Sequence, residues 1–193
     1  MLRRLYDWTI GLAGHRHALW ALAAVSFVEA SVFVVPPDIL LVPMVLAARR
    51  RAWAIAGLCT AASVAGGLAG YGIGFFLYEA VGRPLLDFYG YAARFTEFQD
   101  TYREWGAWIV AAGGFTPIPY KVITIASGAV SLDPVTFTAA SVASRGARFF
   151  MEAALLWRFG PPIRHFIEAN LPLLAALSFV ALVGGFAAVR WLL

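Results

Sequence analysis

Four long apolar blocks, separated by short polar stretches, organise this sequence. The blocks cover residues 18–48, 52–80, 105–159 and 171–193. A helix needs about 20 residues to cross a bilayer. Blocks 52–80 and 171–193 therefore each predict one spanning helix, and residues 134–159 predict a third.

Block 18–48 has the wrong length for a simple span, being too long for one crossing and too short for two. Its centre reads VVPPDILL, where Pro36 and Pro37 remove two backbone donors and break the helix. Arginines flank both ends, and such ends prefer the cytoplasmic side. The pattern predicts a re-entrant hairpin, which is tolerated in a bilayer only where it lines protein or a water-filled cavity.

Residues 105–132 repeat this pattern, with a break in the stretch GGFTPIPYKVITIASG at Pro117 and Pro119. The six letters TAASVA occur at 60–65 and again at 138–143. Each copy thus holds one hairpin and one span, so the second copy enters the membrane inverted. Inverted repeats with broken helices are the architecture of many secondary transporters.

The expected fold is an all-α integral membrane protein forming one domain over residues 1–193. An N-terminal amphipathic helix covers 1–17, the first repeat 18–82, an amphipathic connector 83–104, the second repeat 105–160, and a C-terminal transmembrane helix 171–193. Arginines concentrate on one side of these spans, which predicts a multi-pass protein of the inner (plasma) membrane with a cytoplasmic N-terminus. Gly66, Gly70 and Gly74 form a small-residue stripe that predicts close helix packing.

The composition agrees with a membrane protein, since 61% of residues are hydrophobic, 13% are charged and the mean hydropathy is +0.75. A soluble domain is about one quarter charged. The net charge of +4 is attributed to arginines at anionic lipid surfaces, not to nucleic acid. One cysteine excludes an intrachain disulfide. Because histidines and cysteine do not cluster at metal spacing, no metal or cofactor is expected, and an enzyme is the least favoured class.

Six ionisable residues lie at predicted membrane depth, where each costs at least about 2.5–3.5 kcal/mol to insert. They are Glu29 and Asp38 in the first hairpin, Lys121 in the second, and Arg145, Arg148 and Glu152 in the span 134–159. Such groups are normally paired or face a polar cavity, which indicates a functional site.

The last three of these share one helical face with Ser141, at i, i+4, i+7 and i+11. Arg148 and Glu152 are predicted to form an ion pair. Arg145 and Arg148 repel each other unless acids or an anion lie between them, and arginine forks suit phosphate oxygens.

An anion-binding site is therefore predicted, with the half-helix N-termini after Pro37 and Pro119 facing it. Its proposed substrate-binding residues are Lys121, Arg145, Arg148, Thr116 and Tyr120. Two alternatives remain open, namely that the charges form only internal ion pairs and that Asp38 serves as a helix N-cap.

A family resemblance covers residues 18–160. The segments SFVEASVFVVPPDILLVPMVLAA at 26–48 and GGFTPIPYKVITIASG at 113–128 resemble the DedA family, which shares the VTT (SNARE-associated Golgi protein) domain. SRGARFF at 144–150 resembles its YqaA-type branch. Of the family pattern R-F-x-P-x-x-R, Phe115 and Pro117 match, whereas Gly114 and Tyr120 replace the arginines. Lys121 and Arg145 are the proposed substitutes.

The resemblance implies flippase- or scramblase-like lipid transport, with undecaprenyl phosphate or a phospholipid as the candidate substrate. It also implies proton coupling through Glu29 or Asp38. The expected partners are membrane lipids with an anionic phosphate headgroup, and a homo-oligomer is left open. The alternatives are a proton- or ion-coupled transporter of a small solute and a structural membrane protein with internal ion pairs.

Overall fold

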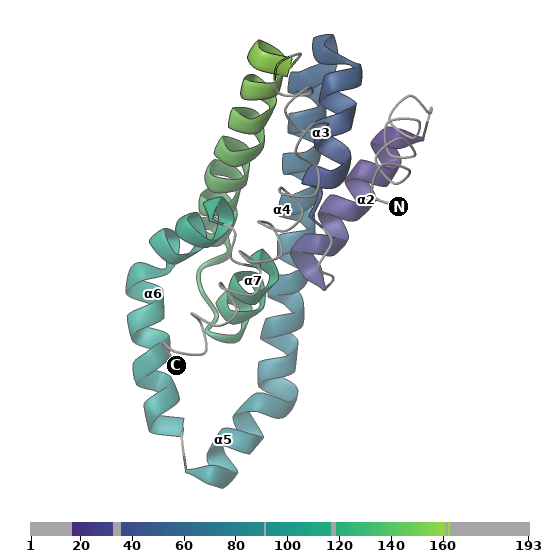
Figure 1. Cartoon of the computed structure of the whole chain (residues 1–193). Coiled ribbons are helices and arrows are strands. Elements are labelled where there is room, and N and C mark those ends of the chain that lie inside the picture. The colour runs from purple at the N-terminus through teal and green to yellow at the C-terminus, as the bar shows by residue number, and fades with distance from the viewer. Residues whose placement is uncertain (1–16, 33–35, 91, 117–118, 161, 163–193) are drawn as a thin grey trace.

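The computed structural model describes residues 17–32, 36–90, 92–116, 119–160 and 162, and within them all regular structure is helical (Figure 1). The predictions for residues 1–16 and for the C-terminal helix 171–193 lie outside the described residues. In chain order the elements are α2 (Ala18–Ser31), α3 (Asp38–Ala47), η1 (Arg49–Arg51), α4 (Ala52–Leu77), η2 (Tyr78–Gly82), α5 (Arg83–Tyr89), α6 (Ala92–Phe115), α7 (Tyr120–Ala129) and a helix over 134–160.

Both predicted helix breaks are confirmed. α2 ends at Ser31, and α3 begins at Asp38, directly after the two prolines. α2 and α3 diverge from this break as the two arms of a V (Figure 1). In the second copy α6 ends at Phe115, and α7 begins at Tyr120 after a proline. In both cases proline stands at the start of the new helix, where its missing N–H has no intrahelical partner to lose.

The longest helical stretch runs without interruption over Arg49–Tyr89, for 41 residues. At 1.5 Å per residue it is roughly 60 Å long. Within the described part of the chain it is the one helix long and apolar enough to cross a membrane. The predicted end of the first repeat at residue 82 is not a helix end, because the chain continues through the π-helical turn η2 into α5.

The glycine stripe of α4 packs closely against other helices, as predicted. A Cβ atom at Gly66 would clash with the backbone of Phe27 in α2. A Cβ atom at Gly74 would clash with the backbone of Ile125 in α7. The absence of side chains on this face therefore lets both broken helices approach α4, which becomes the central element of the fold.

The predicted connector 83–104 is not a separate element. α5 covers its first part, whereas the boundary predicted at residue 104 falls inside α6, which is continuous from Ala92 to Phe115. The buried face of α6 continues past residue 104, because Tyr102, Gly106 and Val110 are buried at i, i+4 and i+8. Packing on one continuous face keeps the helix intact where the change in composition suggested an end.

The helix 134–160 runs antiparallel to α4. Near one end, the Arg49 guanidinium donates to the carbonyl of Trp157. Near the other, the Tyr71 hydroxyl donates to the carbonyl of Leu132 over 2.6 Å. The helix begins at the predicted Asp133-Pro134 junction, where Asp133 Oδ2 accepts from the Thr136 backbone N–H over 2.7 Å and thus serves as the N-cap.

Two apolar clusters form the core. One is built around Leu22, Leu41, Ile55 and Phe149, and the other around Tyr102, Val110, Tyr120 and Phe137. Along the helix 134–160, Arg145 lies between Phe137 of one cluster and Phe149 of the other. The charged residues of the candidate site are thus placed where the two clusters meet.

Candidate functional site

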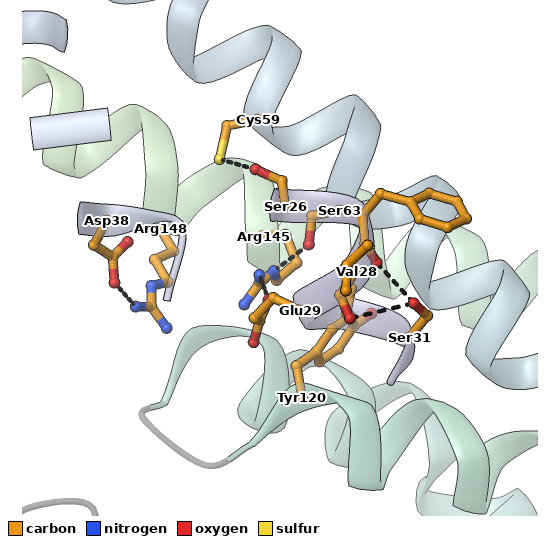
Figure 2. A network of polar contacts seen from close by, with 12 residues as sticks. Ser26, Val28, Glu29, Ser31, Asp38, Cys59, Ser63, Tyr120, Arg145 and Arg148 are labelled. Carbon is orange, nitrogen blue, oxygen red and sulfur yellow. Dashed lines mark hydrogen bonds and ion pairs between the residues drawn. The ribbon is translucent and has the colours of Figure 1, made fainter. Parts of the chain in front are cut away.

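The centre of the site is the buried side chain of Arg145, which is 2% exposed (Figure 2). Its Nη2 lies 2.6 Å from Glu29 Oε2 of α2, and its Nε donates to Ser63 Oγ of α4 over 2.7 Å. Its guanidinium carbon lies 4.9 Å from the ring centre of Tyr120 and 4.8 Å from that of Phe149. Three helices and two aromatic faces thus hold this one cation.

A second arginine pair lies farther along the same helix. Arg148 Nη2 is 2.7 Å from Asp38 Oδ2, at the start of α3 (Figure 2). This pair is more open, since the side chains are 26% and 28% exposed, whereas Glu29 is 15% exposed. A negative charge in the first turn of α3 also suits the helix dipole.

The predicted Arg148–Glu152 ion pair is wrong. In the described part of the chain, the acid within 4.0 Å of Arg148 is Asp38, and Glu152 forms no ion pair. The i, i+4 spacing permits the predicted pair, but in the folded chain the start of α3 places the Asp38 carboxylate against the Arg148 guanidinium.

Lys121 lies apart from the two arginine pairs but joins the two breaks. Its Nζ donates to the carbonyl of Val32 over 3.2 Å, one residue after the end of α2. Lys121 itself is in the first turn of α7. The end of one broken helix and the beginning of the other are therefore in contact, as a shared site requires.

The other two predicted hydrogen-bond donors behave differently. The Tyr120 hydroxyl is buried and donates to Ser141 Oγ, so its ring supports Arg145 while its donor is already used. Thr116, one residue after the end of α6, donates its hydroxyl proton to the carbonyl of Ala112 over 2.7 Å. This hydroxyl proton is therefore used within its own segment.

Sequence reasoning missed Ser63, although a signal for it was present. Ser63 and Ser141 occupy the same place in the two TAASVA copies, and both are fully buried. Ser63 accepts from Arg145, and Ser141 accepts from Tyr120. Aligning the two TAASVA copies matches Ser63 with Ser141, which lies on the polar face already identified. This alignment could therefore have identified Ser63.

Gly114, where the DedA pattern that the sequence resembles has an arginine, packs closely against the helix 134–160. A Cβ atom at this position would clash with Ser144 Oγ and would lie 3.6 Å from Arg145 Cγ. The side chain of Arg145 passes beside the vacant Cβ position from the neighbouring helix. That Arg145 substitutes for the arginine of this pattern stays a prediction.

The site therefore contains two arginines in different states. The Arg145 guanidinium is inaccessible, because an acid, a serine and two aromatic rings surround it. Arg148 has one carboxylate partner and remains partly open. An anion entering this region would meet Arg148 first, and it would compete there with the carboxylate of Asp38.

Comparison with known proteins places the chain among relatives of similar length. No family model matches it, and no solved structure matches it. A Haemophilus influenzae protein described as "Uncharacterized protein" is 35% identical over 185 residues, covering 92% of this chain and 96% of that protein. A Histophilus somni protein, "Uncharacterized protein HI0703 homolog", is 36% identical over 168 residues, covering 85% and 87%. The chain belongs to the same family as these two bacterial proteins.

Proposed function

We propose that this protein is an integral membrane transporter that moves an anionic lipid headgroup between leaflets at the point where its two broken helices meet. The observation that carries the proposal is the contact of Lys121 Nζ with the carbonyl of Val32, which joins the two breaks. Broken helices that meet beside buried charges are typical of substrate sites in secondary transporters.

The surface of the molecule supports a bilayer environment. Large apolar side chains are more than 70% exposed on several helices, including Trp20, Phe76, Phe88, Trp108 and Val135. Large apolar side chains exposed on several helices suit contact with a partner or a membrane. Together with the helix Arg49–Tyr89, this exposed apolar surface supports association with a membrane. The multi-pass arrangement in the inner membrane, with a cytoplasmic N-terminus, stays part of the proposal.

The arrangement of the helices supports an inverted repeat. Each long helix, α4 and 134–160, follows a broken helix, and the two long helices run antiparallel. Two hairpins that enter from opposite faces place their tips together near the midplane. The proposed headgroup path passes between these tips, while the lipid tail stays in the surrounding hydrocarbon.

The three cations of the site differ in their exposure, and we therefore assign them different roles. Arg148 and Lys121 are the accessible cations at the break, and they suit the oxygens of a phosphate group. Arg145 is sealed, so we assign it to holding Glu29 and Tyr120 in place. The proposed headgroup site is therefore smaller than the sequence predicted. It lies on the side of the charged network where Arg148 is found.

Lipid movement in proteoliposomes tests this function. Purified protein is reconstituted with fluorescent phosphatidylglycerol, and transfer between leaflets is followed by quenching of the outer label. Arg148→Gln is expected to lower the transfer rate at least about tenfold, the effect of losing one charged hydrogen bond of about 1.5–3 kcal/mol. Arg158→Gln is the matched control, because Arg158 is exposed near the end of the same helix.

Three outcomes separate the candidate functions. Equal rates for wild type and Arg148→Gln would refute a role for Arg148 in headgroup transfer. Transfer no faster than in protein-free vesicles would contradict lipid transport altogether. Protection from thermal unfolding by inorganic phosphate, without protection by phosphatidylglycerol, would instead favour a transporter of a small anion.

A further inference from the structure

A polar pocket lies at the end of the molecule where α5 and α6 diverge from their junction (Figure 1). Its volume is about 350 Å³, within the range of about 300–1,000 Å³ that is typical of ligand pockets. Its lining comes from η2, α5 and α6, together with Ser131 in the turn after α7. The described lining contains no member of the two arginine pairs. This pocket is therefore separate from the proposed transport site.

Two polar helix faces form the walls of this pocket. On the continuous arm formed by η2 and α5, Glu79, Arg83 and Asp87 line the pocket at intervals of four residues. On α6, Gln99 and Arg103 line it at the same spacing. Residues four apart lie on one side of a helix. Each arm thus turns its polar side toward the other arm.

The outer sides of the same two arms are apolar. Leu85 and Phe88 on α5, and Phe98 and Trp105 on α6, are exposed, and none of them lines the pocket. A water-soluble hairpin has the opposite arrangement, with apolar side chains between its helices and polar side chains outside. Polar inner sides and apolar outer sides suit a hairpin at a membrane surface. An amphiphile, with its headgroup in the pocket and its chains beside the outer sides, fits this arrangement better than a free solute.

The charges of the pocket are balanced and only weakly paired with each other. The Arg83 and Glu79 side chains are 3.4 Å apart and 64% and 46% exposed, so their ion pair is weak. In the described part of the chain, Asp87 forms no ion pair. Arg103 donates through Nε to the carbonyl of Val130 over 3.0 Å, and its Nη2 forms no hydrogen bond within the described residues. Two acids and two arginines are therefore available to a ligand.

We propose that this pocket binds the headgroup of a zwitterionic phospholipid with a primary ammonium, the chemistry of phosphatidylethanolamine. An ammonium group donates three hydrogen bonds, which the carboxylates of Asp87 and Glu79 accept. The phosphate oxygens accept from the guanidinium groups of Arg83 and Arg103. The four charged side chains carry no net charge together, which matches a headgroup that also carries none.

The same pocket is connected to α7 through hydrogen bonds. Arg103 donates to the carbonyl of Val130, and Gln99 Nε2 lies 3.5 Å from the carbonyl of Ala129, at the C-terminal end of α7. Lys121, at the other end of α7, contacts the first break. A headgroup bound to Arg103 therefore strengthens the contact between α6 and the second broken helix.

This inference takes its membrane setting from the proposed function but does not depend on transport. It also assigns a different lipid to each site. The transport site around Arg148 is proposed for an anionic headgroup, whereas the pocket between α5 and α6 is proposed for a zwitterionic one. The two proposals are tested by different measurements and can fail separately.

Binding of dihexanoyl phosphatidylethanolamine to the full-length protein in detergent tests this site, with dihexanoyl phosphatidylcholine as the comparison. The two lipids differ only in the ammonium group, because choline has no N–H to donate. Affinity is obtained from the rise in melting temperature with lipid concentration. Wild type is expected to bind the ethanolamine lipid about tenfold more tightly, the effect of a charged hydrogen bond.

Two variants separate the two halves of the headgroup. Asp87→Asn should lower the affinity for the ethanolamine lipid about tenfold, to that of the choline lipid. Arg83→Gln should weaken the binding of both lipids, because both carry the phosphate, and it should keep the preference for ethanolamine. Glu97→Gln is the matched control, since Glu97 is an exposed acid on α6 that does not line the pocket.

Three results would overturn this inference. They are equal affinities of wild type for the two lipids, an unchanged preference for ethanolamine in Asp87→Asn, and a Glu97→Gln variant that loses the preference as Asp87→Asn does. The transfer of phosphatidylglycerol in proteoliposomes is measured independently of these titrations. Loss of the pocket's selectivity therefore leaves the proposed transport standing, and failure of transport leaves this site standing.

Discussion

Replacing Arg145 by methionine should destabilise the protein more than any other single change to the charged network. The substitution leaves the Glu29 carboxylate, 15% exposed, without its cation. Breaking a buried ion pair by removing one partner costs about 3–5 kcal/mol. For a chain of this size, about 2–4 °C of melting temperature is lost per kcal/mol, which gives a decrease of about 6–20 °C.

The assay is thermal unfolding in detergent, followed by tryptophan fluorescence. Two further variants make it diagnostic. Arg148→Met should cost only about 1 kcal/mol or less, because its pair is about one quarter exposed and solvent screens it. The double variant Glu29→Leu/Arg145→Met should recover most of the stability, since apolar replacement of a whole buried pair is often neutral.

Two results would refute this reasoning. Equal losses for Arg145→Met and Arg148→Met would show that burial does not distinguish the two pairs. A double variant no more stable than Arg145→Met would show that the loss comes from the packing of Arg145 on its aromatic neighbours, and not from the uncompensated charge of Glu29.

Three further predictions concern the framework around the site. Gly74→Ala should lower the free energy of unfolding by about 1–3 kcal/mol, because its Cβ would overlap the backbone of α7. Gly72→Ala, which has open space around it, should be neutral or stabilising. Equal effects of the two substitutions would contradict the packing role of the stripe. The hydrogen bonds from the Thr136 backbone and hydroxyl hold the pKa of Asp133 below its ordinary 3.8, so the N-cap stabilises the fold above that pH and loses its effect as pH falls through the lowered pKa. Asp133→Ala should therefore lower the melting temperature at neutral pH but not in strong acid, and a pH-independent difference would count against the cap. In a variant without the native cysteine, Val32→Cys and Lys121→Cys should be joined in native membranes by a short bifunctional thiol reagent, and no cross-link would contradict the contact between the two breaks.

Local signals in the sequence predicted much of the secondary structure. Proline pairs mark both breaks, because proline removes a backbone donor whatever surrounds it. The break before Tyr120 and the start of α3 at Asp38 follow from that rule alone. The glycine stripe of α4 also follows, since the spacing i, i+4, i+8 places three side-chain-free positions on one face.

Element ends without such a signal were predicted less well. The helix that contains Gly82 continues to Tyr89, and α6 passes through the expected boundary at residue 104. Both errors came from equating a change in composition with a helix end. Tertiary packing decides these positions, because a buried face such as that of Tyr102 and Val110 keeps a helix continuous when its exposed face becomes polar.

The sequence by itself determined which charged residues lie together, because Arg145, Arg148 and Glu152 must share one face of any helix that contains them. Only the tertiary structure decided how they pair. Asp38 stands 110 residues from Arg148 in the chain, and no local spacing rule covers such a distance. Packing of α2 and α3 brings Glu29 and Asp38 to the arginines, and the depth of burial then separates a sealed pair from an open one.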